Sequence, residues 1–128
     1  IYGSIGNDTF DGGAGDDILT GAGGEDTFAW NLGDQGTSTT PAVDTITDFS
    51  SGDKLDLSDL LQGEEIGGAD INNYLTMTSD GFTTTISVSH NPANTSGVTQ
   101  EIIVNGDLTI GSTVSITNLI GDGTIVTG

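Results

Sequence analysis

The stretch GGAGDDILT, residues 12–20, joins a glycine-rich, acidic half to a short apolar half and decides the fold. The same arrangement precedes it as GSIGNDTFD, residues 3–11, and follows it as GAGGEDTFA, residues 21–29. The three nonapeptides share glycine at places one and four, aspartate at place six and a large apolar residue at place eight. A fixed period in three consecutive copies favours a repeat architecture over a flexible Gly/Asp linker.

Each nonapeptide combines a tight turn with a short strand. Its glycines adopt backbone angles that are closed to other residues, so the first six places turn sharply and aim carbonyl oxygens at one point. The last three places form a strand whose place-eight side chain points inward. We expect Phe10, Leu19 and Phe28 inside the fold. Ile1 fits place eight of an earlier repeat, so we expect it in the same buried set, in a chain that begins inside a longer array.

The turns predict a metal site. Two nonapeptides complete one coil, so turns two repeats apart lie on the same edge of the fold. Their carbonyl and carboxylate oxygens suit Ca²⁺, a hard cation that takes six to eight oxygen ligands. We therefore predict that Asp8 and Asp26 share one calcium ion and that Asp17 holds another. The predicted carbonyl ligands come from the same turns: Ser4, Gly6, Gly13, Gly15, Ala22 and Gly24.

Composition supports a role for cations. The 128-residue chain carries 19 acidic residues and one basic residue, Lys54, for a formal net charge of −18. This charge argues against nucleic acid and anionic membranes as partners, because both are bound through Lys and Arg. Twelve of the acids lie in residues 1–59, which repel one another unless cations bind. The chain has no cysteine, so metal is the obvious substitute for disulfide bonds.

The repeats resemble the repeats-in-toxin (RTX) nonapeptide, a calcium-binding parallel β-roll. The block from residue 44 to 58 is similar to the segment that closes the β-roll in RTX proteases, lipases and large adhesins. By that resemblance Asp34 and Asp44 complete the last calcium site, opposite the turn of Asp17. Three further aspartates of the block are interpreted as solvated turn residues, one of them paired with Lys54, rather than as ligands: Asp48, Asp53 and Asp56.

The second half of the chain is rich in Thr, Ile and Val, as strands are. Strands are predicted at residues 43–49, 54–57, 74–78, 82–90, 100–106 and 124–127, with a hairpin turn at 79–81 and short helices at 59–62 and 113–120. The prediction is an all-β fold. A parallel β-roll at residues 1–42 is capped by a small β-rich domain at residues 43–128, which contains one or two short helices.

The second half also resembles the type I secretion C-terminal target domain of large bacterial RTX adhesins. That resemblance implies a calcium-dependent folding and export module of a protein secreted to the cell surface, monomeric as an isolated fragment. The implied partners are the ABC transporter, the membrane fusion protein and the outer-membrane channel of type I secretion. Members commonly end in Asp after the last apolar pair, whereas this chain ends in Thr127 and Gly128.

No catalytic constellation accompanies these motifs. The chain has no cysteine, and its one histidine, His90, stands beside Asn91 and Pro92 without spacing that suggests a triad. We therefore predict a non-enzymatic module. Two alternatives remain open, namely the C-terminal secretion domain of a secreted RTX hydrolase and a ligand-binding module of the adhesin. Ice binding is not predicted, because places three and five carry no threonine ladder.

Overall fold

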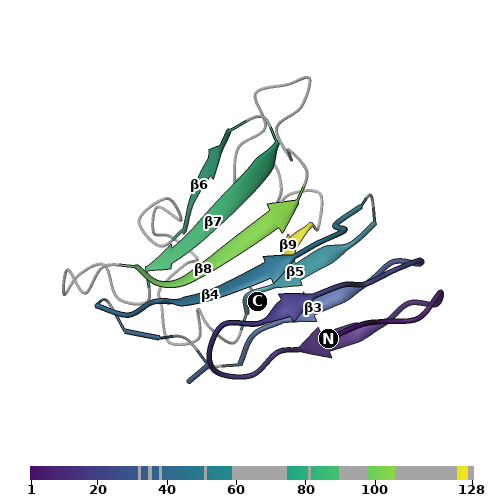
Figure 1. The fold of residues 1–128 in the computed structure, drawn as a ribbon, viewed down its shortest axis with the longest axis horizontal. Coiled ribbons are helices and arrows are strands. Elements are labelled where there is room, and N and C mark those ends of the chain that lie inside the picture. Colours follow the sequence, from purple (N-terminus) through teal and green to yellow (C-terminus); the bar gives the residue numbers. More distant parts are fainter. Residues whose placement is uncertain are drawn as a thin grey trace.

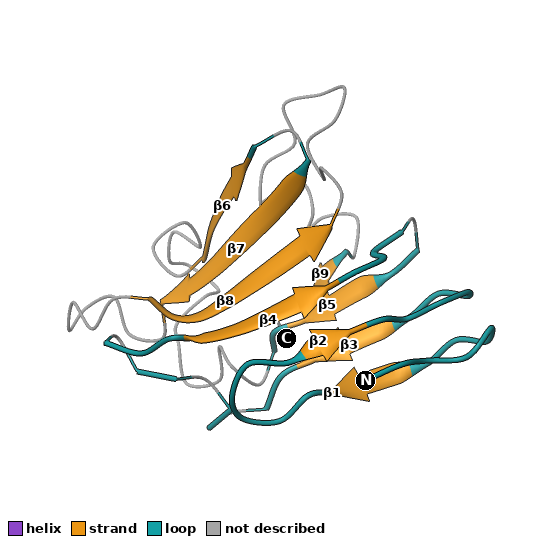
Figure 2. Ribbon diagram, in the orientation of Figure 1, coloured by secondary structure: helices purple, strands orange, loops and turns teal. Residues whose placement is uncertain are grey.

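A computed structural model describes residues 1–31, 33–34, 36–37, 39–50, 52–58, 75–80, 82–89, 98–105 and 124–126. Within these ranges the fold consists of strands and loops, with no helix (Figure 2). The all-β prediction is thereby confirmed. The strands are β1 (Thr9–Asp11), β2 (Ile18–Leu19), β3 (Thr27–Ala29), β4 (Ala42–Ile46), β5 (Lys54–Asp56), β6 (Leu75–Ser79), β7 (Thr83–Ser89), β8 (Val98–Asn105) and β9 (Ile125–Val126).

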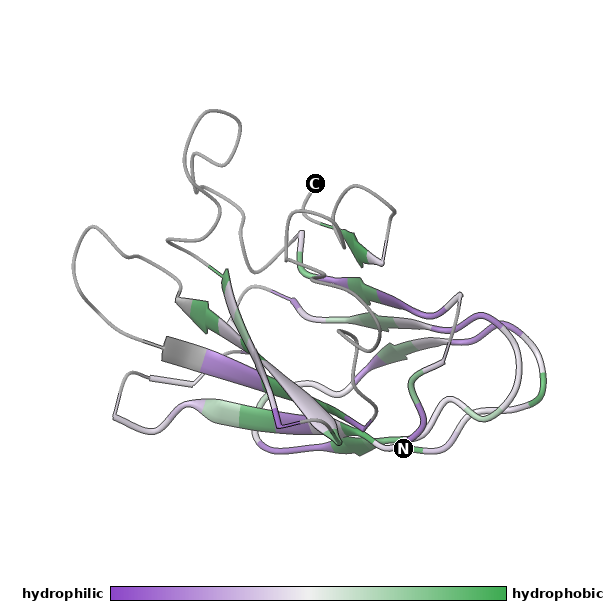
Figure 3. Cartoon of the chain, turned by 90° about the horizontal axis from the view of Figure 1, so that it is seen from above, coloured by the Kyte–Doolittle hydropathy of each residue, from purple (hydrophilic) through white to green (hydrophobic). Residues whose placement is uncertain are grey.

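The strands form two sheets that the chain visits in turn (Figure 1). One sheet has the order β1-β3-β5-β9 and the other β2-β4-β8-β7-β6. From β1 to β5 each strand pairs in parallel with the strand two places along, so each coil crosses both sheets. Figure 3 shows the two layers from above, with hydrophobic residues recurring in the strands of both. This is the predicted parallel β-roll.

Place-eight side chains from both sheets build the core of the roll. Phe10 is 6% exposed, Leu19 1% and Phe28 0%, which confirms the prediction for these three. The rings of Phe10 and Phe28 stack with centroids 5.0 Å apart, because their strands pair in register. Ile1 was predicted to join them and does not, since it is 57% exposed. Its backbone pairs with that of β2, but the strand position that it occupies is the outer edge of the sheet.

The nine-residue period continues beyond the three obvious repeats. Residues 39–47 and 48–56 form two more turn-and-strand units, whose place-eight residues are Ile46 and Leu55. Leu19 lies in register with Ile46, and Phe28 with Leu55. Ile46 and Leu55 are completely buried. The two sheets therefore run past residue 42, where the sequence analysis divides the chain, and that division stays a prediction.

The far end of the larger sheet has a different construction. β8 pairs in parallel with β4 and antiparallel with β7, and β6 and β7 form an antiparallel hairpin. Asp80 stands in the predicted turn of this hairpin, where its backbone N–H donates to the Thr83 carbonyl at 3.2 Å. The helices predicted at residues 59–62 and 113–120 lie outside the described residues. None of the described residues forms a helix long and apolar enough to cross a membrane.

Candidate metal centre

The turns of the roll have the backbone conformations that the glycine pattern predicts. Gly15 and Gly24, both at place four, have φ angles of 100° and 105°. Gly13 and Ala22, both at place two, have φ angles of 83° and 71°. These are left-handed conformations that glycine adopts without a steric penalty and that alanine adopts at a cost. The turns of the second and third nonapeptides are therefore closed by their places two and four.

Three turns stack along one edge of the roll, and their place-six aspartates connect them. These turns are residues 3–8, 21–26 and 48–53. The Asp8 N–H donates to Asp26 Oδ1 at 2.9 Å, and the Asp26 N–H donates to Asp53 Oδ1 at 2.9 Å. Each place-six carboxylate thus supports the equivalent residue of the neighbouring turn. Asp8 and Asp26, which the sequence predicts to share one ion, are brought together.

The predicted carbonyl ligands on this edge lie between the stacked turns. The Ser4 carbonyl accepts the Gly23 N–H at 3.2 Å. A side chain on Gly24 would collide with the Gly6 carbonyl, since its Cβ would lie 2.5 Å from the oxygen. The two turns are therefore packed backbone against backbone, and the role of the Gly6 carbonyl as a calcium ligand stays a prediction.

Place one is glycine because the aspartate of its own repeat occupies the space of a side chain. A Cβ on Gly12 would lie 2.7 Å from Asp17 Oδ2, and a Cβ on Gly21 would collide with Asp26 Oδ2. The second carboxylate oxygen of each aspartate therefore turns back over its own loop. Repeated on both edges, this places one carboxylate oxygen within each glycine-rich turn.

On the opposite edge Asp17 faces Asp44. The Asp17 N–H donates to Asp44 Oδ1 at 2.8 Å, so the predicted partners are again brought together. Asp17 Oδ2 is buried and has no hydrogen-bond donor within the described part of the chain. Asp44 is 1% exposed, and its Oδ2 accepts the Trp30 indole N–H at 2.6 Å and the Gln100 amide at 2.9 Å. Burial raises the pKa of the Asp44 carboxyl, while these hydrogen bonds lower it in part.

Asp34 and Asp16 line the same hollow of the structure. Both line an open hollow of about 390 Å³ between the turn at residues 14–16 and the segment at 40–42. Asp34 Oδ2 accepts the Asn31 N–H at 3.1 Å, and Asp16 Oδ1 accepts the Val43 N–H at 2.8 Å. Asp34 therefore remains a predicted ligand of this edge, with Asp16 as a neighbour that the sequence analysis did not single out.

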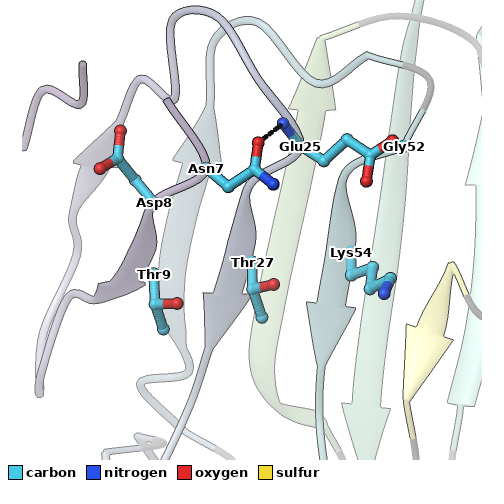
Figure 4. A pocket seen from close by; sticks show the side chains of 7 residues that line it. All are labelled: Asn7, Asp8, Thr9, Glu25, Thr27, Gly52 and Lys54. Atoms are coloured by element: carbon cyan, nitrogen blue, oxygen red, sulfur yellow. Dashed lines mark hydrogen bonds between the residues drawn. The ribbon is translucent and has the colours of Figure 1, made fainter. Parts of the chain in front are cut away.

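A polar hollow of about 210 Å³ lies where the strands β1, β3 and β5 begin (Figure 4). Asn7 Oδ1 accepts the Glu25 N–H across it at 2.8 Å. The hydroxyl side chains of Thr9 and Thr27 line its floor beside Lys54, the three being neighbours in register. The hollow extends across the stacked turns and is lined by side chains on their outer face.

The interpretation of Asp53 as a solvated turn residue is wrong. Asp53 is 3% exposed, and its Oδ2 accepts the Ser50 N–H at 2.8 Å. Asp48 is half-buried and accepts the N–H groups of Gly21 and Ala22 at 2.9 and 2.7 Å. Asp48 and Asp53 therefore both accept backbone N–H groups of the turn at residues 21–26. Asp56 instead accepts the Ser58 N–H within its own segment at 3.1 Å.

The nine-residue period places Asp53 among the place-six aspartates, a position that the sequence interpretation did not assign to it. Asp53 lies nine residues after Asp44 and 27 after Asp26, at place six of its unit. The repeat pattern is interrupted at residues 30–38, which carry Gln35 at place six and Thr37 at place eight. The phase nevertheless survives that interruption.

The donor set fits calcium bound through mixed oxygen ligands. Among the described residues no three acidic or histidine side chains converge on one point, as they do in a site made from side chains alone. The roll instead offers one carboxylate per turn together with backbone carbonyls, which is a ligand set that Ca²⁺ accepts. Asp17 Oδ2, which is buried and has no donor from the described segments, is the oxygen that most needs a cation.

Comparison with known proteins agrees with this geometry. The solution structure of the AlgE6R3 subunit of the mannuronan C5-epimerase from Azotobacter vinelandii is 30% identical, with a TM-score of 0.64 over 98% of this chain. This chain spans 65% of the length of that structure. The AlgE6R2 subunit of the same enzyme is 28% identical, with a TM-score of 0.60, covering 93% of this chain and 70% of its own.

The C-terminal domain (RV) of MpAFP is 27% identical, with a TM-score of 0.53, covering 89% of this chain and 85% of its own. A search of curated protein sequences gives no match. The family model of the peptidase M10 serralysin C-terminal domain matches residues 3–117. Domains of this RTX β-roll type are non-catalytic repeat modules of secreted proteins and generally bind Ca²⁺. The chain belongs to the serralysin C-terminal domain family.

Proposed function

We propose that this chain is a calcium-dependent folding and export module at the C-terminal side of a type I secreted RTX protein. The observation that carries the proposal is the repeated placement of a carboxylate oxygen within a glycine-rich turn, where Asp17 Oδ2 is buried and has no donor among the residues that the structure describes. In a chain with a net charge of −18, such oxygens repel one another unless a cation lies between them.

The proposed ligands are the place-six carboxylates of Asp8, Asp17 and Asp26, with Asp34 on the second edge and carbonyl oxygens of the turns. Bound calcium supplies positive charge that offsets the repulsion and links neighbouring turns. Because the sites form only in the folded chain, binding free energy contributes to folding. Extracellular calcium modules bind at about 10⁻⁴–10⁻³ M, so the roll stays unfolded where calcium is scarce and folds outside the cell.

The export role follows from that difference between compartments. An unfolded acidic chain threads through a transporter, and folding on the outer side prevents its return. The proposed partners are the ABC transporter, membrane fusion protein and outer-membrane channel of type I secretion, and the proposed destination is the cell surface. The parent that we favour is a large bacterial surface adhesin.

A secreted peptidase is the second candidate parent. The match to the serralysin C-terminal domain family favours a peptidase as the parent, because that family is named for the C-terminal domain of a peptidase. A ligand-binding role of the β-rich half within an adhesin stays a third proposal. All three parents use the same calcium-dependent module.

Calcium binding is tested by titrating the whole chain in a calorimeter after treatment with chelator. We expect endothermic or exothermic heats that saturate at about millimolar Ca²⁺, with little response to Mg²⁺, which requires a tighter octahedral shell. Asp26→Asn should raise the required calcium concentration at least about tenfold, whereas the matched control Asp80→Asn, in the hairpin turn, should leave it unchanged. Equal behaviour of the two variants would contradict the ligand assignment.

Export is tested by fusing the chain to the C-terminus of a passenger protein in cells that carry a type I transporter. The passenger should appear in the medium, and deletion of the transporter should retain it in the cell. Release that does not depend on the transporter would contradict the export role while leaving the calcium site unaffected.

A further inference from the structure

Asp44 occupies place six of its unit, the position of a calcium ligand, yet its carboxylate is already enclosed by protein donors. It is 1% exposed. Oδ1 accepts the Asp17 N–H at 2.8 Å, and Oδ2 accepts both the Trp30 indole N–H at 2.6 Å and the Gln100 amide N–H at 2.9 Å. A carboxylate has about four acceptor positions, so three of them are occupied.

The other place-six aspartates differ at the same atom. Oδ2 of Asp8 accepts donors from Ser4 and Oδ2 of Asp53 from Ser50, each within its own turn. Oδ2 of Asp26 lies against Gly21 of its own turn, and Oδ2 of Asp17 has no donor in the described part of the chain. At Asp44 alone among these five, the second oxygen is bound by side chains from distant segments.

Those two donors exclude a cation from Oδ2. The indole and amide hydrogens carry positive partial charge and point at the oxygen that a calcium ion would have to share. Trp30 is 2% exposed and Gln100 is completely buried, so neither donor could turn to water if calcium displaced it. At this unit the two donors therefore stabilise a buried carboxylate by hydrogen bonds, the role that the proposed function gives to calcium at the other place-six aspartates.

The hydrogen bonds to Asp44 connect the roll with β8, the strand that carries the antiparallel strands. Trp30 directly follows β3, Asp44 lies in β4, and Gln100 lies in β8. β8 pairs with β4 in parallel and carries the antiparallel strands β7 and β6 on its other side. The hydrogen bond from Gln100 to Asp44 thus connects the roll to the strand that carries the antiparallel part.

We propose that Asp44 is not a calcium ligand but a metal-free lock, in which Trp30 and Gln100 hold its carboxylate and dock β8 onto the roll. This revises the prediction that Asp44 completes the last calcium site, and it rests on the proposed function in so far as the other place-six aspartates bind calcium. Asp44 is accordingly a positioning residue.

The test uses the whole chain, in which Trp30 is the only tryptophan and reports on the lock by its fluorescence. Bound calcium per chain is measured by equilibrium dialysis for the unaltered protein, Asp44→Asn and Asp26→Asn. We expect Asp44→Asn to bind as many ions as the unaltered chain, at a midpoint within about twofold, with red-shifted Trp30 emission and a lower urea midpoint in saturating calcium. Asp26→Asn should raise the calcium midpoint at least about tenfold.

Loss of a bound ion in Asp44→Asn, or a rise in its calcium midpoint equal to that of Asp26→Asn, would overturn the lock and leave the proposed function intact. If Asp44→Asn does not fold, Gln100→Glu decides. A second carboxylate beside Asp44 should lower the urea midpoint without tightening calcium binding, whereas tighter binding would identify a cation site there.

If the unaltered chain binds no calcium, the proposed function fails and the lock is judged by unfolding alone. The lock then still requires that Asp44→Asn lower the urea midpoint and shift the emission of Trp30. Unchanged values of both would refute it.

Discussion

The larger sheet contains two parts of opposite construction. At one end β2 and β4 belong to a roll whose repeat strands are only two to five residues long and are linked through acidic turns. At the other end β6, β7 and β8 are antiparallel strands of five to eight residues. β6 and β7 contain no acidic residue. One sheet therefore joins a part in which buried carboxylates oppose folding to a part stabilised by an ordinary hydrogen-bond ladder.

Under the proposed function, this difference predicts where calcium matters. In the roll, two or three backbone pairs per strand cannot offset chain entropy together with charge repulsion. In the antiparallel part, longer ladders with alternating burial do not bring carboxylates together. The following changes should affect the two parts unequally.

The largest effect is expected from Leu19→Asp. Leu19 is 1% exposed at place eight, and an unpaired charge there costs more than the about 2–5 kcal/mol of a Leu→Ala change. That is comparable to the whole stability of a small domain, about 5–15 kcal/mol. Circular dichroism in saturating calcium should show no roll. Ile18→Asp, which adds the same charge to the 66% exposed neighbour, is the control and should still fold.

A smaller effect is expected from Gly21→Ala. The new methyl group would collide with Asp26 Oδ2, so the turn must shift, at a cost of about 1–3 kcal/mol. Gly6→Ala is the matched control, because its nearest neighbour would be Ser4 Oγ at 3.7 Å. Thermal unfolding in calcium measures both. Equal stability of the two variants would show that the aspartate does not occupy the space over place one.

The smallest effect is expected from Asp80→Asn in the β6–β7 turn. Asp80 Oδ1 accepts the N–H groups of Phe82 and Thr83 at 2.8 and 2.7 Å, and these bonds lower the pKa of its carboxyl. The stabilisation by ionised Asp80 is present above the ordinary carboxyl pKa of about 3.9 and is lost as the pH falls through the lowered value. Because Asp80 is fully solvent-screened, the unfolding midpoint should decrease only slightly, equally with and without calcium. A calcium-dependent decrease would contradict the separation of the two parts.

The period of nine was sufficient to predict the roll and the burial of Phe10, Leu19 and Phe28, while the calcium ion shared by Asp8 and Asp26 stays a prediction. It fails at the ends for physical reasons. Ile1 has the right phase, but it is 57% exposed, and its backbone pairs at the outer edge of β2. Asp53 has the right phase as well, but its unit lacks glycine at places one and four, so the local signal that marks a turn is absent.

The role of Asp44 could not be predicted from local sequence. Its carboxylate is bound by Trp30, 14 residues away, and by Gln100, 56 residues away. Neither residue type indicates such a contact in the sequence. The sequence around a place-six aspartate is the same whether its carboxylate faces a metal ion or an indole. The register of β8 against β4 brings Gln100 to Asp44, and the coil of the roll brings Trp30 there.

Amide hydrogen exchange of the whole chain, followed by mass spectrometry in chelator and in millimolar calcium, tests the central claim most directly, because it reports each part separately. The account predicts that peptides covering β1, β2 and β3 exchange as an unfolded chain in chelator and slow at least about a hundredfold in calcium. Peptides covering β6 and β7 should retain part of their protection in chelator. Protection of β1 to β3 that is equally high in chelator would contradict calcium-dependent folding of the roll.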